Sequence, residues 1–479
     1  MDIIPVILFW GFALWGIFGP PYILLYLFFG SMVFGSLSVI NPSLVGGLTL
    51  TPTPVILLLL IGRVLVNRRG LMFTINQITR WQGVVLLFLF WLVALIATMF
   101  MPRLFFGEVS IIPVRLTFFT VGEPLVPTSQ NFSQFAYLSV SVLGVVAFYR
   151  LLLNSSYYPH LLNGICVGGG LVIVTGVLDL LGQYLPLDML LDPFRTATYS
   201  LMTDVEILGS KRVVGLMPEA SAYGSVALTF LCLLYFFRTA ITQAWLRERV
   251  VPLLIVLLML FIWLSTSSSA YVGLGVFALV AMIEWSGRSA SSSVGSVRQW
   301  GFEWWVSWGA LLSISLVVVF YPDLLTPLLT KIDELVLNKT DTGSYEERSL
   351  WTQVGWQSLL DTYGLGVGVG STRTSNVAAA IFSNTGVLGG TLYFLFVARL
   401  LLSRSPAQSS PVGRKLLLGA KYAYFPSFIV ALLAGTTADF GSANAFLYGL
   451  LLATAATPSA PQSVSKAPYQ EFPLFKGGL

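Results

Sequence analysis

Residues 82–101 read QGVVLLFLFWLVALIATMFM and contain no charged side chain. A run of about 20 apolar residues is long enough to cross the hydrocarbon core of a bilayer as a helix. No water is available there to satisfy an open backbone, so an isolated strand is excluded. This stretch therefore predicts a membrane-spanning helix.

The whole chain shares this character, since 56% of its 479 residues are hydrophobic and only 10% are charged. Soluble domains usually carry about 25% charged residues. We therefore expect an all-α polytopic membrane protein with a single transmembrane domain over residues 1–456 and 12–13 transmembrane helices. The expected spans are residues 4–18, 20–38, 53–66, 82–101, 132–151, 161–183, 216–237, 250–266, 269–285, 304–321, 376–398, 417–434 and 440–456.

The number of spans depends on the first 38 residues. Gly19-Pro20-Pro21 interrupts two apolar runs there. Proline disrupts a helix, so the tripeptide is either a tight turn between two short helices or a break within one tilted helix.

The basic residues predict an orientation, because Lys and Arg gather in short cytoplasmic loops. With the ends that carry Arg63 and Arg80 in the cytoplasm, alternation of the spans places 17 of the 26 basic residues on that side. The other members of this set are Arg68, Arg69, Arg150, Arg238, Arg247, Arg249, Arg288, Arg298, Arg399, Arg404, Arg414, Lys415, Lys421, Lys466 and Lys476. Only four acids join them, namely Glu248, Glu284, Glu303 and Glu471.

The net charge of +5 thus describes an orientation in a membrane and not a nucleic-acid partner. Two loops on the outer face, near residues 184–215 and 322–375, are too long and polar to be simple turns. Apolar residues at helical spacing in the second loop, as in Trp351–Leu360, predict short helices along the outer membrane surface. Residues 457–479, rich in Pro, Ser and Gln, are expected to form a flexible cytoplasmic tail.

We expect no metal and no cofactor. His160 is the only histidine and has no neighbouring Cys or carboxylate, and both cysteines, Cys166 and Cys232, lie inside expected spans. The run Gly364–Gly370 lacks the preceding buried strand of a dinucleotide fingerprint. It is either a flexible outer-surface turn or a segment whose missing side chains let a bulky substrate or phosphate approach the backbone.

Charges near membrane depth are costly and mark candidate functional sites. Arg212 and Glu219 lie seven residues apart at the entry to an expected span. They form either a structural ion pair or a functional pair, in which Arg212 grips an anion and Glu219 acts as general base.

Three further charged residues lie on the outer face, with Arg348 within the second outer loop, Arg373 just before the expected span 376–398 and Asp439 just before the expected span 440–456. Arg348 and Arg373 are candidates for anion contacts, and the alternative for each is an anchor in the lipid headgroups. Asp439 is a candidate site residue that could instead cap the span that follows it.

Several of these segments resemble short motifs seen in other proteins. Arg212-Val-Val-Gly215 with Pro218-Glu-Ala-Ser221 resembles the R-x-x-G-x-x-x-E-x-S signature of many exopolysaccharide polymerases. Arg348-Ser-Leu-Trp351 followed by the glycine run resembles an Arg-x-x-x-Trp stretch and glycine turn, with the Arg–Trp spacing shortened by one. Asn384-Thr-Gly-Val-Leu-Gly389 is similar to an E-x-G-i-l-G helix start, with Thr385 in place of the acid. With about twelve spans and a large outer loop before the last few, the chain resembles the O-antigen ligase and polymerase superfamily, in particular its Wzy-type polymerases.

Two departures bear on function. The ligases of this superfamily carry a His-Asn pair after the glycine turn, where this chain has Ser375-Asn376, which favours a polymerase. The family's Ser-Arg pair is also missing, because residues 265–269 contain no arginine.

The resemblance implies a GT-C-like glycosyltransferase of the bacterial inner membrane with its active site facing the periplasm. The implied reaction is a metal-independent, inverting transfer of an undecaprenyl-pyrophosphate-linked glycan onto a lipid-linked repeat unit. Arg212 and Arg348 would hold the pyrophosphate and Glu219 would be the base or acceptor anchor. The expected substrate-binding residues are Lys211, Tyr345, Trp351, Tyr363, Arg373, Asn376 and Asp439.

Membrane lipids would surround the protein, and the resemblance allows a chain-length regulator and export proteins as partners. The alternatives are a ligase-like glycan transferase and a transporter or flippase of lipid-linked sugars. A transporter usually places its ionisable residues near the bilayer midplane and often contains paired repeats. Here the charges gather at the outer ends of the expected spans and no repeat is visible, which favours an enzyme.

Overall fold

The structure is a computed structural model of the chain that describes residues 3–41, 49–80, 83–114, 122–185, 188–199, 201–203, 206–207, 210–291, 343–406 and 410–456. Helices account for most of these residues, and the strands are two residues long. The expectation of an all-α polytopic membrane protein is confirmed.

The α-helices are α1 (Ile3–Phe18), α2 (Ile23–Ser31), α3 (Pro52–Leu65), α4 (Arg68–Thr79), α5 (Val85–Leu104), α6 (Ser129–Leu152), α7 (Tyr158–Gly182), α8 (Asp188–Leu191), α9 (Ala220–Phe237), α10 (Val251–Leu264), α11 (Ser268–Ser291), α14 (Gly343–Asp361), α15 (Val377–Leu402), α16 (Pro411–Ala434) and α17 (Gly441–Ala455). Short 3₁₀ helices are η2 (Ser155–Tyr157), η3 (Asp192–Phe194) and η4 (Arg238–Ala240), and a π-helical turn, η5 (Leu246–Val250), precedes α10. The strands β1 (Ser110–Ile111) and β2 (Glu123–Pro124) form one antiparallel hairpin, and β3 (Glu206–Ile207) and β4 (Ser210–Lys211) form another.

Twelve of the thirteen expected spans overlap a helix in the described part of the chain, whereas residues 304–321 lie outside it. In the same part of the chain, seven helical segments are long and apolar enough to cross a membrane. They are Val85–Leu104, Ser129–Leu152, Ser155–Gly182, Ala220–Ala240, Ser268–Arg288, Val377–Leu402 and Pro411–Ala434. The apolar helices α1, α3 and α17 are shorter. The total of 12–13 spans stays a prediction.

At the N-terminus, Gly19-Pro20-Pro21 separates two helices. α1 and α2 pack against each other beside this turn, where a Cβ on Gly16 would lie 2.8 Å from a methyl group of Leu24. The expected span 20–38 is too long, because α2 ends at Ser31. The following segment instead bonds to distant loops: Ser36 N donates to Leu216 O (2.9 Å) and Ser38 N to Thr196 Oγ1 (3.0 Å).

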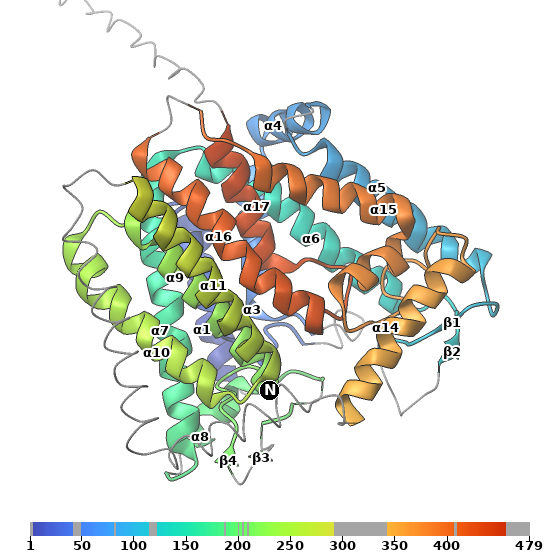
Figure 1. Cartoon of the computed structure of the whole chain (residues 1–479), viewed down its shortest axis with the longest axis horizontal. Coiled ribbons are helices and arrows are strands. Elements are labelled where there is room, and N and C mark those ends of the chain that lie inside the picture. The colour runs from blue at the N-terminus through green and yellow to red at the C-terminus, as the bar shows by residue number, and fades with distance from the viewer. Residues whose placement is uncertain are drawn as a thin grey trace, which may run out of the picture.

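Figure 1 shows α4 lying across one end of the bundle, with α8, α14 and the hairpins toward the opposite end. We refer to these as the α4 end and the α14 end. The sequence analysis did not predict α4. At the α4 end, helices α3, α6 and α15 each carry an arginine in the last turn, namely Arg63, Arg150 and Arg399. A cation there also complements the helix dipole.

The two expected outer loops are partly helical. Residues 184–215 contain α8, η3 and the β3–β4 hairpin. The described part of the second loop, from residue 343, forms α14, a 19-residue helix packed against α15 and β1. It is longer than the short helices expected. Residues 322–342 and the tail 457–479 lie outside the described residues.

The glycine run is neither a flexible turn nor a space for a ligand. Gly364, Gly366, Gly368 and Gly370 all have positive φ, a region open to glycine at little cost. Residues 366–370 are buried, and their N–H groups bond to neighbouring helices: Val367 N donates to Ser383 O (2.8 Å) and Gly368 N to Asn384 O (3.0 Å).

The space that a side chain would need is filled by the protein's own backbone. A Cβ on Gly366 would lie 2.5 Å from Gly386 N, and one on Gly370 would lie 2.5 Å from Gln130 O. Gly386 itself has a φ of +74° and breaks the helical path of α15. The run is therefore a packed connection between α14 and α15.

A pair of alanine substitutions separates backbone strain from steric exclusion. Gly107 has a φ of +74° and a Cβ there would meet no atom within 4 Å, whereas Gly370 has a φ of +84° and a Cβ there would lie 2.5 Å from a carbonyl oxygen. We expect Gly107→Ala to cost about 1 kcal/mol and Gly370→Ala to cost about 1–3 kcal/mol more. Thermal unfolding in detergent measures both, and equal losses would contradict the packing described for the run.

Candidate functional site

Four charged residues singled out in the sequence come together at the α14 end, and we call them the arginine site. Arg212 and Glu219 lie before α9, Arg348 lies in α14, and Arg373 lies between α14 and α15. Glu219 interacts electrostatically with both Arg212 and Arg373, and so does Arg348. Arg212 and Arg373, which come from separate segments, thus both lie within electrostatic range of Glu219, and Arg348 lies within range of both arginines.

Arg212 is oriented by the turn between α10 and α11. Its Nε donates to Ser265 O (3.2 Å) and Thr266 Oγ1 (3.0 Å), and its Nη2 donates to Thr266 O (3.1 Å). Thr266 has a φ of +46°, an unfavourable conformation for a β-branched residue. The turn at residues 265–266 therefore supplies acceptors for the arginine of another segment.

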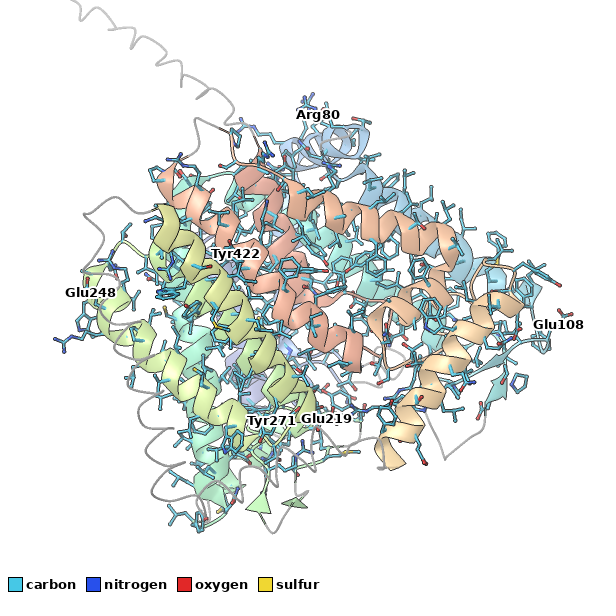
Figure 2. The ribbon with its side chains drawn as sticks, in the orientation of Figure 1. Arg80, Glu108, Glu219, Glu248, Tyr271 and Tyr422 are labelled. Carbon is cyan, nitrogen blue, oxygen red and sulfur yellow. The ribbon has the colours of Figure 1, made fainter. Side chains whose placement is uncertain are left out.

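Glu219 occupies the N-cap position of α9, with extended backbone angles. The hydroxyl of Ser221 donates to its Oε1. The carboxylate also benefits from the positive end of the α9 dipole. Figure 2 shows Glu219 at the same end of the bundle as Tyr271, whose hydroxyl donates to Trp263 O at 2.7 Å.

The charges in the arginine site favour the binding of an anion. Burial lowers the pKa of Arg212, as does Arg348, whereas Glu219 raises it. Burial also lowers the pKa of Arg373, which Glu347 and Glu219 raise and Arg348 lowers. An arginine remains charged despite such shifts. Within the described residues, neither Arg212 nor Arg373 forms an ion pair, so the Arg212–Glu219 structural pair is not formed.

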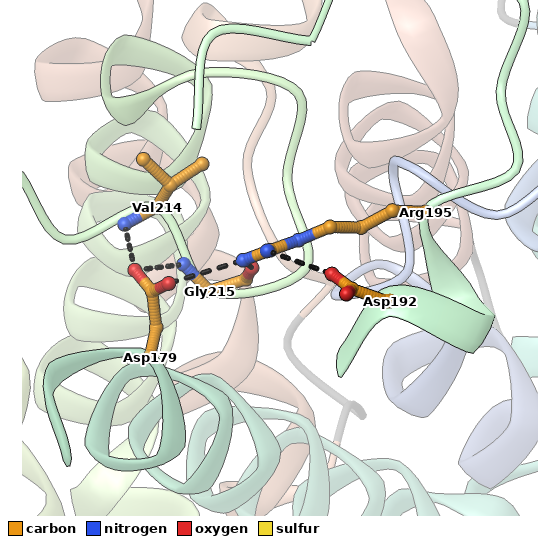
Figure 3. A network of polar contacts seen from close by, with 5 residues as sticks. All are labelled: Asp179, Asp192, Arg195, Val214 and Gly215. Atoms are coloured by element: carbon orange, nitrogen blue, oxygen red, sulfur yellow. Dashed lines mark hydrogen bonds and ion pairs between the residues drawn. The ribbon is translucent and has the colours of Figure 1, made fainter. Parts of the chain in front are cut away.

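A buried acid fixes the backbone between Arg212 and Glu219. Asp179, at the end of α7 and 1% exposed, accepts hydrogen bonds from Val214 N (2.6 Å) and Gly215 N (3.0 Å) through Oδ2. Its Oδ1 pairs with Arg195 Nη2 at 3.1 Å, and that Nη2 also donates to Gly215 O at 3.3 Å (Figure 3). This network fixes the backbone N–H groups of Val214 and Gly215 and the C=O group of Gly215.

Gly215 has a specific role in the same loop. Its φ is +60°, and a Cβ there would lie 3.0 Å from the ring of Tyr223 and 3.2 Å from Thr175 Oγ1. Positive φ and close packing together require glycine. This accounts physically for the glycine that follows Arg212 by three residues.

Arg373 is positioned by Trp351 of α14. Its guanidinium carbon lies 3.9 Å from the centre of the Trp351 ring, an arrangement favoured by the cation–π interaction. Trp351 is 9% exposed, and Arg373 N donates to Ile112 O at 2.8 Å. One face of the Trp351 ring is thus occupied by Arg373, and this contact orients the arginine.

Of the remaining candidate substrate-binding residues, some lie near the arginine site and others lie elsewhere in the fold. Lys211 is the last residue of β4 and directly precedes Arg212. Tyr345 is exposed in the first turn of α14, one turn from Arg348. Tyr363 is 88% exposed beyond the other end of this 19-residue helix, which is about 28 Å long, so α14 separates the two tyrosines.

Asn376 and Asp439 both bond to helix starts. The side chain of Asn376 accepts from Ala378 N (2.9 Å) and Ala379 N (3.2 Å) and caps α15. Asp439 Oδ1 accepts from Gly441 N (3.0 Å) at the start of α17, which supports the capping alternative. Burial raises the pKa of Asp439, and hydrogen bonds from Ser141 and Gly441 N lower it.

Asp179 and Arg195 were missed in the sequence analysis. The signal was available for Asp179, because an acid within the expected span 161–183 is costly unless it has partners. Nothing in the sequence identifies Arg195 or the backbone of residues 214–215 as those partners.

The described residues contain no group of three or more His, Cys, Asp or Glu side chains that could hold a metal ion.

No protein-family model matches the sequence, and a comparison with curated proteins finds no match.

The Asp179 network can be tested with two isosteric substitutions that act on the same arginine. Asp179→Asn leaves the largely buried Arg195 without its nearest counter-charge, so we expect a loss of about 3 kcal/mol of stability. Asp192→Asn removes an exposed partner 3.4 Å from Arg195, and we expect a loss below about 1 kcal/mol. Unfolding in detergent measures both, and equal effects would argue against a structural role for the buried pair.

Proposed function

We propose that the protein is a membrane glycosyltransferase, a polysaccharide polymerase that transfers an undecaprenyl-pyrophosphate-linked glycan onto a lipid-linked repeat unit. The observation that carries the proposal is the arginine site, in which Arg212 and Arg373 both interact electrostatically with Glu219 and with Arg348. The bacterial inner membrane, with the α14 end in the periplasm, is the location that fits this substrate. The sequence resemblance to Wzy-type polymerases supports the same assignment.

The proposed reaction has clear demands. A hydroxyl group of the acceptor sugar attacks the anomeric carbon of the donor, the carbon–oxygen bond to pyrophosphate breaks, and the configuration inverts. The leaving pyrophosphate gains negative charge, which preoriented cations stabilise. Arginines match phosphate oxygens bidentately, and Glu219 accepts the proton of the attacking hydroxyl group.

The fixed geometry of the cations supports this role. Backbone carbonyls orient Arg212 and an indole ring orients Arg373, so neither side chain is neutralised by a carboxylate at hydrogen-bonding distance. Cations held this way are ready for an anion before it binds. Both arginines interact with Glu219, which lies at one end of the bundle (Figure 2), and this position favours chemistry at a membrane surface over transport through the midplane.

Replacing Glu219 by Gln tests the proposed base. The amide keeps the size of the side chain but cannot accept the proton, so we expect chain growth to fall by about 100-fold or more. Purified protein in liposomes receives lipid-linked repeat units, and product length is measured by gel electrophoresis. Glu248→Gln is the matched control, since Glu248 is exposed and pairs with Arg247 at the start of α10. Full activity of Glu219→Gln would remove Glu219 from this role.

Lysine substitutions test the proposed pyrophosphate contacts. Arg212→Lys and Arg348→Lys keep the charge but lose the planar fork, so we expect chain growth to fall about tenfold or more for each. Arg103→Lys is the control, because Arg103 is exposed at the end of α5 and donates only to Met99 O among described residues. The rate of lipid pyrophosphate release is the measurement. Equal rates in all three variants would contradict the assignment.

The same liposomes separate the polymerase from its alternatives. Longer glycans without translocation support the polymerase. Transfer to a different lipid acceptor without chain growth identifies a ligase-like enzyme, and translocation without a longer product identifies a transporter.

A further inference from the structure

Helix α4 has two different faces. Gly70 and Gln77 are buried, and the Phe73 ring meets the Tyr149 ring of α6 with 5.2 Å between ring centres. On the opposite face Leu71, Met72 and Ile75 are 55%, 63% and 59% exposed. Residues at these spacings share one side of a helix, so α4 presents an unpartnered apolar strip.

The placement of α4 is set by contacts with its neighbours. Asn67 caps the helix, accepting from Gly70 N at 2.8 Å, and also accepts from Arg150 Nη2 at 3.4 Å. A Cβ on Gly70 would lie 2.4 Å from Leu65 O, so glycine lets α4 turn sharply away from α3. The helix therefore lies across the ends of α3, α5 and α6 and does not continue their direction (Figure 1).

Arginines surround the apolar strip. Arg68, Arg69 and Arg80 are exposed at the two ends of α4. Behind them, Arg150 interacts electrostatically with Arg69, and Arg399 donates to Gly83 O at 3.2 Å. In the described part of the chain none of these five arginines forms an ion pair with a carboxylate.

We propose that α4 lies in the headgroup layer of the membrane and that its outer surface binds anionic phospholipid headgroups. The α4 surface consists of Arg68, Arg69, Leu71, Met72, Ile75 and Arg80. An amphipathic helix with a basic and an apolar component lies in the plane of the interface, with its apolar side chains at the acyl boundary. Basic residues beside it attract anionic lipids.

The helices beside α4 favour lipid headgroups over a soluble protein as the binding partner of the α4 surface. α5 and α6, which α4 contacts, are both long and apolar enough to cross a membrane. Their ends at α4 therefore lie at the level where headgroups begin. The uncompensated positive charge complements an anionic phosphate group. The inference does not depend on the proposed function, since the arginine site lies at the opposite end of the bundle.

Lipid titration of the full chain in neutral detergent tests the charge component. Phosphatidylglycerol should raise the unfolding temperature, whereas phosphatidylcholine and inorganic phosphate should not. In Arg68→Gln/Arg69→Gln the apparent affinity for phosphatidylglycerol should fall about thirtyfold. Arg247→Gln/Arg249→Gln removes the same charge at the start of α10 and should change it less than about threefold.

Two outcomes would overturn the charge component. One is equal phosphatidylglycerol affinity in the Arg68/Arg69 double variant and the unmodified protein. The other is a full shift produced by inorganic phosphate alone, which would identify a site for free anions and not for lipid.

Spin labelling in vesicles of phosphatidylcholine and phosphatidylglycerol tests the apolar component. A label at Ile75→Cys should collide with oxygen more than with a water-soluble nickel chelate, because oxygen concentrates among acyl chains. A label at Gln243→Cys, exposed in the segment before α10, provides the aqueous reference. Nickel accessibility at residue 75 equal to that at residue 243 would place the strip in water, and low accessibility to both oxygen and nickel would place it against another protein. Either result would refute the proposal.

Discussion

The carboxylate of Asp179 determines the geometry of the loop that carries the candidate site. It is buried at the end of α7 and accepts hydrogen bonds from two consecutive backbone N–H groups, Val214 and Gly215, while Arg195 balances its charge. A buried charge needs this full set of partners. Asp179 holds the loop in place. As a result, Arg212, just before the loop, reaches the α10–α11 turn, and Glu219, just after it, takes the N-cap position of α9. A single buried group thus sets the positions of both functional candidates.

The site itself concentrates like charges and tolerates their repulsion. Arg212 is oriented by neutral acceptors and Arg373 by the Trp351 ring, while Glu219 is the carboxylate that interacts with both. A carboxylate at hydrogen-bonding distance would stabilise either arginine but would also occupy the groups that face an anion. Cations that are fixed in place and only partly neutralised leave these groups open to an anion. When the anion binds, it relieves the repulsion between the arginines, and the arginines need not rearrange.

Hydrophobic patterning predicted most helices, because a span must be apolar over its whole length, and scarcity of charge identified Arg212, Glu219, Arg348 and Arg373. The parts that the sequence did not predict depend on contacts between distant segments. α2 stops at Ser31 because the following backbone bonds to residues 196 and 216. The glycine run was expected to be either a flexible turn or a segment open to a substrate, yet the helices around it fill the space beside each glycine. Trp351 was expected to bind substrate, and its contact with Arg373 was not predicted. Substrate binding by Trp351 stays a prediction.

The two ends of the molecule show how one residue type serves different purposes. At the α4 end, Arg68, Arg69 and Arg80 are exposed beside an apolar strip, an arrangement suited to an extended, fluid partner such as a lipid surface. At the α14 end, Arg212 and Arg373 are partly buried, Arg212 is held by hydrogen-bond acceptors and Arg373 by the Trp351 ring, and both interact with Glu219. Burial and fixed direction add little to nonspecific attraction, which depends on charge alone. They matter for a ligand whose phosphate oxygens must take defined positions, and this contrast is the physical basis for proposing a pyrophosphate site at the α14 end and a lipid-binding surface at the α4 end.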